Sequence, residues 1–423
     1  MVNNTKRQTG YAIQSETIRA CTQMCVALLL GCLISLADAA TANNKPIVPQ
    51  KSAVKHDFLP LGVFTDVISN DEPKALAALK RIEENWDDSS AAMLIEMVYQ
   101  IPNGRALEKI IALLEKATAR AFDGDVNPWY TWLWSTERAV HPDYAEFKAT
   151  LMSPIDPRFR EYFEGHPKTT IRLDEVRWGG VRRDGIPPLK IPKMISTREA
   201  TWLEDDNVVF GIVINGDVRA YPKRILAWHE MFKDRIGGLE LPGVYCTLCG
   251  ALVLYDVTVN GVQHELGTSG FLYRSNKLMY DHATKSMWST LTGKPVIGPL
   301  VGKGIELKSL YVVTTTWKEW RTRHPDTQVL SLDTGYQRDY GEGVAYHDYF
   351  ATDRLMFIVP RRDERLANKA EVLALRQPDE TLAIAADFLA AHPVYQVRMG
   401  KLNMVVLTDT SGANRVYESK ELG

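Results

Sequence analysis

The stretch VVFGIVINGDVRAYPKRILAWHE, residues 208–230, decides the fold. Its first part contains two runs rich in Val, Ile and other strand-forming residues, separated by Asn215-Gly216. Asn-Gly favours a two-residue turn because both residues tolerate the positive φ that this turn requires. The stretch therefore predicts a β-hairpin, and ALVLYDVTVNGVQHELG (251–267) predicts a second one that turns at Asn260-Gly261.

The residues after the first hairpin, KRILAWHEMFKDRI (223–236), carry apolar side chains at helical spacing. These side chains are Ile225, Trp228 or His229, Phe232 and Ile236. We expect one helix over 223–236, and we expect Gly237-Gly238 to end it.

The hairpin and helix pattern recurs near the C-terminus in VLALRQPDETLAIAADFLAAHP (372–393). His229 and His392 occupy matching positions that are 163 residues apart (392 − 229 = 163). With one residue deleted, Cys246 matches Thr408 and Cys249 matches Ser411. The sequence thus predicts a duplicated hairpin-helix-hairpin unit whose fold does not need the two cysteines.

Four segments follow from the change of pattern along the 423 residues. Residues 1–39 join Lys6, Arg7 and Arg19 to an apolar run that ends at Ala37-Asp38-Ala39, and this arrangement predicts a cleaved signal peptide. Residues 40–57 are a polar leader, 58–165 form a helical domain, and 170–423 form the duplicated strand-rich domain. We therefore expect an α+β fold, in a periplasmic or secreted protein without a membrane span after signal cleavage.

The composition is typical of a globular protein, with 45% hydrophobic and 24% charged residues. A formal net charge of -2 gives no basic field, so we expect no nucleic-acid partner. The aromatic run NPWYTWLW (127–134) is typical of a core or of a domain-packing face, and the alternative is a surface that recruits a protein partner to the helical domain.

The motif CTLCG (246–250) carries the chemistry. Cys21, Cys25 and Cys32 leave with the signal peptide, so Cys246 and Cys249 are the cysteines of the exported chain. A C-x-x-C-G turn between two strands is typical of a metal knuckle, because the glycine allows both thiolates to face one metal. Thiol exchangers usually have this motif at the start of a helix.

We predict that Cys246 and Cys249 bind copper or zinc, with His229 or Met279 completing the site. A histidine such as His229 is somewhat more often a hydrogen-bonded core residue than a ligand, and a single Met279 is more often a core residue. His264 is expected on the surface of a hairpin, and Asp281 and His282 in a turn. Two alternatives stay open: a dithiol/disulfide redox protein, and an envelope interaction module in which the cysteines only rigidify a turn. Whether the protein is an enzyme is undecided, because the sequence places no acid–base pair beside the motif.

Five motifs in this order resemble the bacterial family named only as domain of unknown function 3179. They are DGIPPLKIPK (184–193), RAYPKRILAWHE (219–230), YCTLCGALVLYD (245–256), GTSGFLYRSNKLMYD (267–281) and SMWSTLTGKPVIGPL (286–300). The resemblance covers about residue 174 to the C-terminus and leaves out the helical domain. It implies an exported or envelope-associated protein and brings no established activity.

The resemblance also favours a functional role for six recurring positions: Cys246, Cys249, His229, Glu230, Met279 and Asp281. This chain departs from the family pattern at Thr247, where proline is usual, and at His282, where arginine is usual. Neither departure removes a candidate metal ligand.

Overall fold

The structure is a computed structural model that describes residues 58–101, 104–122, 124–377 and 380–420. The predicted signal peptide and leader lie outside these residues. The segment from Asp57 to Gly423 is one compact unit. Its described residues contain helices and many strands, so the predicted α+β class is confirmed. No helix among them is long and apolar enough to cross a membrane.

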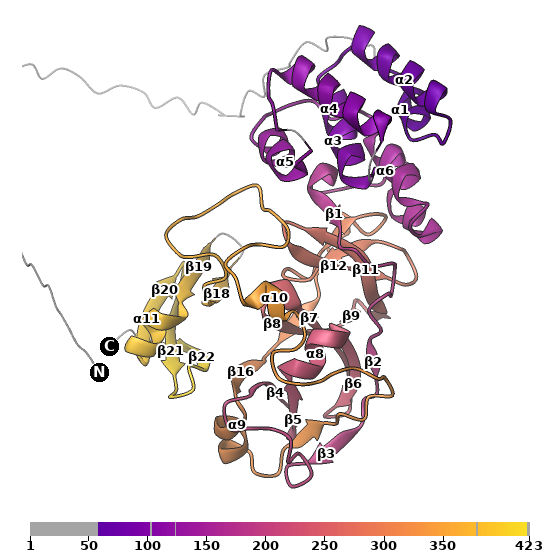
Figure 1. The fold of residues 1–423 in the computed structure, drawn as a ribbon. Helices are drawn as coiled ribbons and strands as arrows, with labels where there is room; N and C mark the ends of the chain where they lie inside the picture. Colours follow the sequence, from indigo (N-terminus) through magenta and orange to yellow (C-terminus); the bar gives the residue numbers. More distant parts are fainter. Residues whose placement is uncertain (1–57, 102–103, 123, 378–379, 421–423) are drawn as a thin grey trace, which may run out of the picture. The chain divides into compact units, whose positions relative to one another are not determined.

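The N-terminal part of this unit is helical, drawn in indigo to magenta in Figure 1. Its helices are α1 (Leu61–Val67), α2 (Glu72–Glu84), α3 (Ser90–Gln100), α4 (Arg105–Thr118), α5 (Val126–Trp134), α6 (Tyr144–Met152) and α7 (Arg160–Phe163), with a 3-10 turn, η1 (Pro157–Phe159). Asp71 caps α2 by accepting a hydrogen bond from the N–H of Lys74 at 3.1 Å, as a helix N-cap requires. The aromatic run forms α5, and its Trp129 and Tyr130 are completely buried. This run is therefore a core element.

The helices share a hydrophobic core with the first sheet, whose order is β1-β11-β12-β13-β14. Its strands are β1 (Val176–Trp178), β11 (Leu266–Tyr273), β12 (Asn276–Asp281), β13 (Met287–Ser289) and β14 (Pro295–Ile297). Phe159 of η1 stacks edge-on against Phe271 of β11, with ring centroids 4.7 Å apart. The change from helices to strands near residue 165 thus does not interrupt the core.

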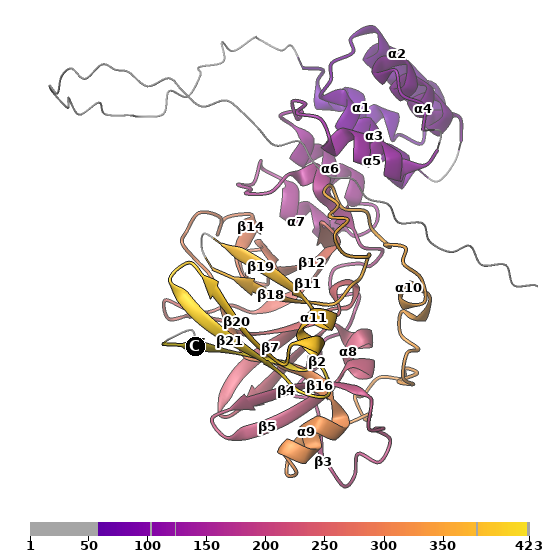
Figure 2. The same ribbon diagram turned by 90° about the vertical axis from the view of Figure 1, so that its left-hand side faces the viewer.

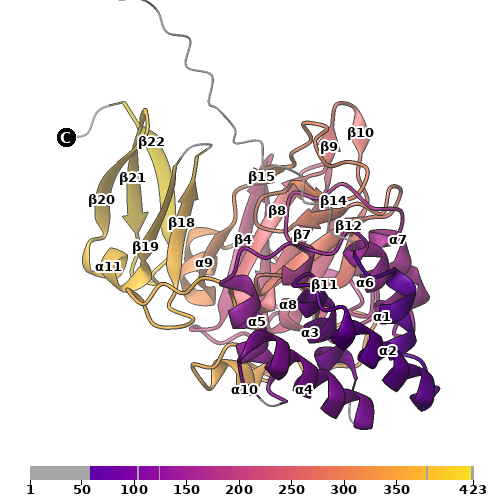
Figure 3. The same ribbon diagram turned by 90° about the horizontal axis from the view of Figure 1, so that it is seen from above.

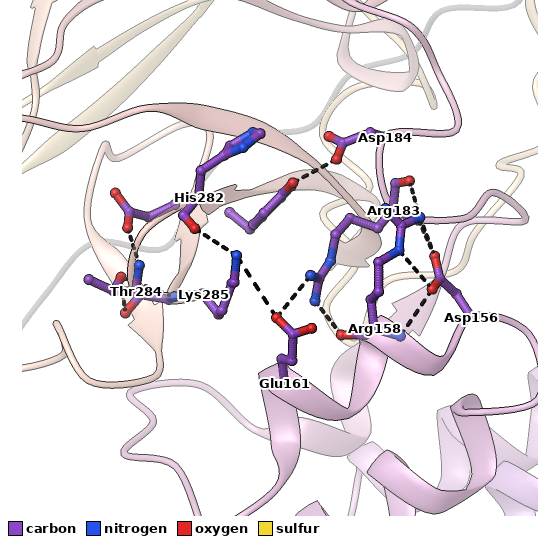
Figure 4. Close-up of polar contacts among 11 residues, drawn as sticks. Asp156, Arg158, Glu161, Arg183, Asp184, His282, Thr284 and Lys285 are labelled. Carbon is purple, nitrogen blue, oxygen red and sulfur yellow. Dashed lines mark hydrogen bonds and ion pairs between the residues drawn. The ribbon is translucent and has the colours of Figure 1, made fainter.

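Hydrogen bonds and ion pairs between charged side chains also connect the helices to the segments that flank this sheet (Figure 4). Asp156 accepts hydrogen bonds from the side chain of Arg158 and from the N–H of Arg183. Arg183 in turn donates to Glu161 of α7 at 3.0 Å, and Lys285, beyond β12, lies 3.9 Å from the same carboxylate. Because cations and carboxylates alternate in this network, their charges compensate each other, and its role is structural.

Two further five-stranded sheets form the middle of the chain. The second sheet contains, in this order, β15 (Lys308–Leu310), β8 (Ala251–Asp256), β7 (Leu239–Cys246), β6 (Met231–Ile236) and β2 (Leu189–Lys190). The third contains β16 (Val313–Thr316), β4 (Val208–Ile214), β5 (Asp217–Pro222), β17 (Gln328–Leu330) and β3 (Met194–Ser196). Helix α8 (Lys223–His229) connects β5 to β6, and α9 (Trp317–Arg323) follows β16.

The first predicted hairpin is present, whereas the second, predicted over 251–267, is limited to a short strand pair because β8 and β11 belong to different sheets. Strands β4 and β5 pair around Asn215 and Gly216, whose φ angles are 49° and 82°. Asn260 and Gly261, with φ of 52° and 78°, connect β9 (Thr258–Val259) to β10 (Val262–Gln263).

The predicted helix over 223–236 is wrong in its second half. Helix α8 ends at His229 because Glu230 adopts a left-handed conformation, φ 54°, while its N–H still bonds the carbonyl of Leu226 at 2.7 Å. Met231–Ile236 is a strand instead, in which Phe232 and Ile236 are buried and Arg235 is exposed. Gly237-Gly238 forms the turn from β6 to β7. The spacing of Phe232 and Ile236 fits both periods, so the apolar pattern alone did not decide between them.

The last part of the chain has two small sheets, drawn in yellow in Figure 2 and Figure 3. Strands β18 (Val372–Arg376) and β19 (Thr381–Ala385) form a hairpin, and β20 (Val394–Met399), β21 (Leu402–Thr408) and β22 (Asn414–Ser419) form a three-stranded sheet. Helix α11 (Ala386–Ala391) lies between them in the chain. The order strand, strand, helix and three strands is also that of β4, β5, α8, β6, β7 and β8.

A candidate thiol site at the end of strand β7

The C-x-x-C motif forms a tight turn between two central strands, as the sequence predicts. Strand β7 ends at Cys246, a 3-10 turn η3 covers Thr247–Cys249, and β8 begins at Ala251. Gly250 closes the turn in a left-handed conformation, φ 63°, which a glycine adopts without the strain of a side chain. Its N–H bonds the carbonyl of Thr247 at 3.2 Å.

Both thiols of this turn are free, but they differ in access. Cys246 is 2% exposed, whereas Cys249 is exposed to solvent. The two sulfurs lie within hydrogen-bonding reach of each other. The side-chain amide of Asn276, the first residue of β12, donates to the sulfur of Cys249 at 3.0 Å. The turn thus places one cysteine at the surface and the other in the interior.

The surroundings of the two sulfurs separate their acidities. A hydrogen bond from the thiol of Cys249 lowers the pKa of Cys246, and the backbone N–H groups of Lys277 and Cys249 lower it further. The same sulfur–sulfur hydrogen bond raises the pKa of Cys249. Cys246 is therefore the thiol that ionises first, and the thiolate is the form that reacts with disulfides or binds metals.

A buried ion pair borders the thiols. The carboxylate of Glu230 lies 2.9 Å from the ammonium of Lys277, and these residues are 8% and 4% exposed. Glu230 is at the left-handed end of α8, where its carbonyl accepts from the N–H of Tyr245 at 2.8 Å. Its negative charge opposes ionisation of Cys246 and so raises the pKa of this thiol. Burial of a paired carboxylate and ammonium gives little net stability.

Residues 336–350, which we call the tyrosine strap, contact this region through three hydroxyl groups. Tyr340 bonds His229 at 2.6 Å, Tyr346 donates to Glu230 at 3.4 Å, and Tyr349 donates to the carbonyl of Leu248 at 3.2 Å. Tyr349 belongs to α10 (His347–Phe350). The strap therefore contacts the C-x-x-C turn and the end of α8 together.

His229 takes part in this strap contact, and its two ring nitrogens bond Pro187 and Tyr340. Its Nδ1 lies 2.9 Å from the carbonyl of Pro187, which can only accept a hydrogen bond, so Nδ1 carries the proton. Its Nε2 then accepts from the hydroxyl of Tyr340. The ring is completely buried, and burial lowers the pKa of His229. Both nitrogens are thus occupied in a neutral histidine.

The other residues selected from the sequence have different surroundings. Met279 is completely buried in an apolar cluster with Met231, Val244 and Trp288. The expectation that His264 lies on the surface is wrong: it is 7% exposed and its Nδ1 lies 2.9 Å from Asp281. Asp281 is the buried last residue of β12. Its charge keeps this histidine in the core, because a buried polar group requires a partner.

Among the described residues, no group of three or more His, Cys, Asp or Glu side chains is arranged to hold a metal ion. The two sulfurs and the nearby carboxylate of Glu230 are the donors that the turn itself offers. Metal binding at Cys246 and Cys249 therefore stays a prediction, in which His229 would first have to leave Tyr340 or Pro187.

Lys277 and Asn276 are site residues that the sequence reasoning missed. Both come from β12, about thirty residues after the cysteines, where the residues SNKLMYD contain one lysine in an otherwise strand-like run. A lysine within a buried strand was the available signal, because lysine is rarely buried without a charged partner.

Comparison with protein families matches residues 183–422 to the model described as Protein of unknown function (DUF3179). The chain belongs to this family. The match confirms the predicted resemblance and contains every residue of the thiol site. Comparisons with curated proteins and with solved structures gave no match.

Proposed function

We propose that the protein is a dithiol/disulfide exchanger in which Cys246 and Cys249 alternate between two thiols and one disulfide. The observation that carries the proposal is the pairing of an exposed thiol with a buried, more acidic one in a single turn. Such a pair can take up an outside disulfide and then close on itself, because the second sulfur is already within reach. The oxidising compartment expected for an exported protein supplies suitable partners.

The corresponding turn of the last sheet supports a chemical role for the cysteines. Residues 409–413 connect β21 to β22 without any cysteine, so an antiparallel strand pair of this kind closes without thiols. A purely structural role would also be served better by residues that do not oxidise.

Metal binding by the same thiols is the competing proposal, with copper or zinc as the ion. It is favoured by the two sulfurs that share one turn, and a dithiolate suits either ion. His229 and Met279 have other contacts, so the third donor would be Glu230 or a side chain that moves. A bound metal and a disulfide exclude each other, since the metal requires the thiolates.

Equilibration in glutathione buffers of graded potential tests the proposal. The protein is quenched with acid, alkylated, and the free thiols are located by mass spectrometry. We expect one reversible two-electron transition confined to Cys246 and Cys249. Thiols that stay reduced at every potential, together with a stoichiometric metal in elemental analysis, would establish the metal site instead.

We further propose that residues 208–256 and 371–418 are duplicated units. In support, Gly211 pairs with Ala220 as Ala374 pairs with Ala383, and both partners are 163 positions later (374 − 211 = 163; 383 − 220 = 163). The pairing of Met231 with Val244 recurs at the same offset as that of Val394 with Leu407. An experimental structure should superpose the two units strand by strand. A different strand order in either unit would reject the duplication.

Export is proposed from the N-terminal sequence alone. We expect the mature chain to begin near Ala40, after Ala37-Asp38-Ala39. N-terminal sequencing of native protein tests this, since Met1 would exclude cleavage and an acylated Cys32 would identify a lipoprotein.

A further inference from the structure

We propose that a thiol partner forms its mixed disulfide with Cys249, while Cys246 acts as the leaving and resolving sulfur. This inference rests on the proposed dithiol/disulfide function and assigns the direction of each bond exchange. The partner is a compound or protein that carries a thiol when it reduces the pair and a disulfide when it oxidises it.

Access assigns the first role. A thiolate must approach a disulfide along the line of the S–S bond, so the attacked sulfur has to be reachable from solvent. Cys246 is the last residue of β7, which lies between β6 and β8, and it is 2% exposed. Cys249 is exposed at the end of the turn, where Asn276 binds its sulfur. An outside sulfur therefore reaches Cys249 and not Cys246.

The hydrogen bonds around the buried sulfur assign the second role. The N–H groups of Lys277 and Cys249 point to the sulfur of Cys246 and stabilise its thiolate, which agrees with the lowered pKa of this thiol. A thiol with a lower pKa leaves faster in an exchange reaction. The site thus exposes the sulfur to be attacked and stabilises the sulfur that departs.

A reducing partner with two thiols reacts with the Cys246–Cys249 disulfide in two steps. One partner thiolate attacks the sulfur of Cys249, the Cys246–Cys249 bond breaks, and its electron pair leaves on Cys246. The second partner thiol loses its proton and attacks the partner sulfur of the mixed disulfide, so that Cys249 departs as a thiolate. The partner becomes a disulfide by losing two electrons and two protons, and the pair becomes a dithiol. A disulfide-bearing compound reverses these steps: the proton of Cys249 passes to Cys246 across their hydrogen bond, and the Cys249 thiolate attacks the compound, whose first sulfur leaves as a thiolate. Cys246 then loses its proton again and attacks the sulfur of Cys249, so that the second sulfur of the compound leaves as a thiolate.

Single-cysteine variants of the motif test the assignment in the full chain. Reduced Cys246→Ser and Cys249→Ser proteins are mixed with glutathione disulfide, and the mixed disulfide is located and timed by peptide mass spectrometry. Rates are measured over a range of pH and extrapolated to the fully ionised thiol, which removes the difference in acidity. We expect Cys249 to react at least tenfold faster than Cys246, and the two rates to converge in guanidinium chloride. Equal rates in the folded proteins, or faster reaction at Cys246, overturn the assignment.

A second arm uses an oxidised protein substrate in place of glutathione disulfide. Reaction of Cys249 with both substrates supports a protein partner, and reaction with glutathione disulfide alone supports a small thiol. If the unaltered pair forms no internal disulfide in glutathione buffers, the proposed function itself fails. If the internal disulfide forms but the mixed disulfide with glutathione forms faster on Cys246 than on Cys249, only the present assignment fails.

Discussion

Two turns of this chain have similar positions between antiparallel strands but use their polar groups in different ways. In the turn after β21, the carboxylate of Asp409 accepts hydrogen bonds from the N–H and hydroxyl of Ser411, the N–H of Ala413 and the guanidinium of Arg415. In the turn after β7, the two sulfurs interact with each other and with groups of β12. The polar groups of the turn after β21 stabilise that turn, whereas the sulfurs of the turn after β7 contact another strand.

The surroundings of Asp409 and of Cys249 differ as those of a structural and a reactive polar group do. Asp409 accepts hydrogen bonds from its own turn and from Arg415 of β22, and Arg323 of α9 lies 3.7 Å away, so a change at Asp409 is expected to affect stability. Cys249 is exposed and contributes little packing, while a buried ion pair, Glu230 and Lys277, sits beside its partner thiol. We therefore expect changes in the turn after β7 to alter chemistry and changes in the turn after β21 to alter stability.

The largest expected effect is the loss of redox cycling when a thiol is removed. Cys249→Ser should abolish the two-electron transition in glutathione buffers, because no second sulfur remains to close the disulfide. Ser411→Ala at the corresponding place in the other turn is the matched control and should leave the transition unchanged. A surviving transition in Cys249→Ser would place the redox chemistry elsewhere in the chain.

Asp409→Asn should instead destabilise the fold by about 1–3 kcal/mol, because partly buried donors lose a charged acceptor. Burial alone raises the pKa of Asp409, but the hydrogen bonds from Ser411 and Arg415 lower it overall below its ordinary value. The carboxylate therefore stabilises the fold above the unfolded-state pKa of about 3.9, and this stabilisation is lost as pH falls through the lower folded-state pKa. Urea unfolding should show a gap between wild type and variant that narrows in this acidic range, with redox cycling unaffected. A gap that stays constant down to acidic pH would argue against a charged acceptor.

A pair of histidines extends the comparison from the turns to their neighbouring helices. His229→Asn should cost about 1–2 kcal/mol, because the buried ring bonds both Pro187 and Tyr340. His392, which is exposed and follows α11, provides the matched control, and His392→Asn should change stability much less.

The contribution of His229 to the free energy of unfolding should depend on pH. Its folded-state pKa is lowered by burial, so the unfolded chain takes up the proton first as pH falls. The contribution of His229 is present above the unfolded-state pKa of about 6.5 and decreases below it, toward the lower folded-state pKa. A stability gap between wild type and His229→Asn that widens below this pH would contradict the neutral, buried ring.

The smallest expected effect concerns the acidity of the thiol pair. Glu230→Gln removes a negative charge that raises the pKa of Cys246 and leaves Lys277 positively charged nearby, so the first thiol should ionise at lower pH. Thiolate absorbance during a pH titration measures this shift. Glu240→Gln removes an exposed carboxylate from β7, the strand that ends at Cys246, and should leave the pKa of the thiol unchanged. A shift of equal size in both variants would mean that Glu230 has no special place beside the thiols.

Local signals predicted much of the fold. Asn215-Gly216 and Asn260-Gly261 located both hairpins because few dipeptides adopt their turn conformation. The C-x-x-C-G turn was predicted for the same reason, since Gly250 supplies the left-handed residue. The predicted helix over 223–236 is wrong after His229. Glu230 adopts a left-handed conformation there and β6 pairs with β7, and a glutamate does not indicate such a conformation in the sequence.

The composition of the site was harder to predict than its position. Cys246 and Cys249 are three positions apart in the sequence, but Asn276 and Lys277 reach them from β12, which belongs to another sheet. Nothing in the local pattern couples these strands. His229 was selected because it precedes the motif by seventeen residues (246 − 229 = 17), yet its ring contacts Tyr340 of the strap, 111 residues later (340 − 229 = 111). Spacing along the chain thus identified reactive residue types without showing which of them meet.

The state of the two cysteines inside cells that express the chain tests the central claim most directly. Cells are quenched with acid, the thiols are alkylated, and Cys246 and Cys249 are located by mass spectrometry before and after brief exposure to an oxidant or a reductant. We predict that the pair shifts reversibly between dithiol and internal disulfide. A pair that keeps one state under both treatments, with or without a bound metal, would contradict dithiol/disulfide exchange.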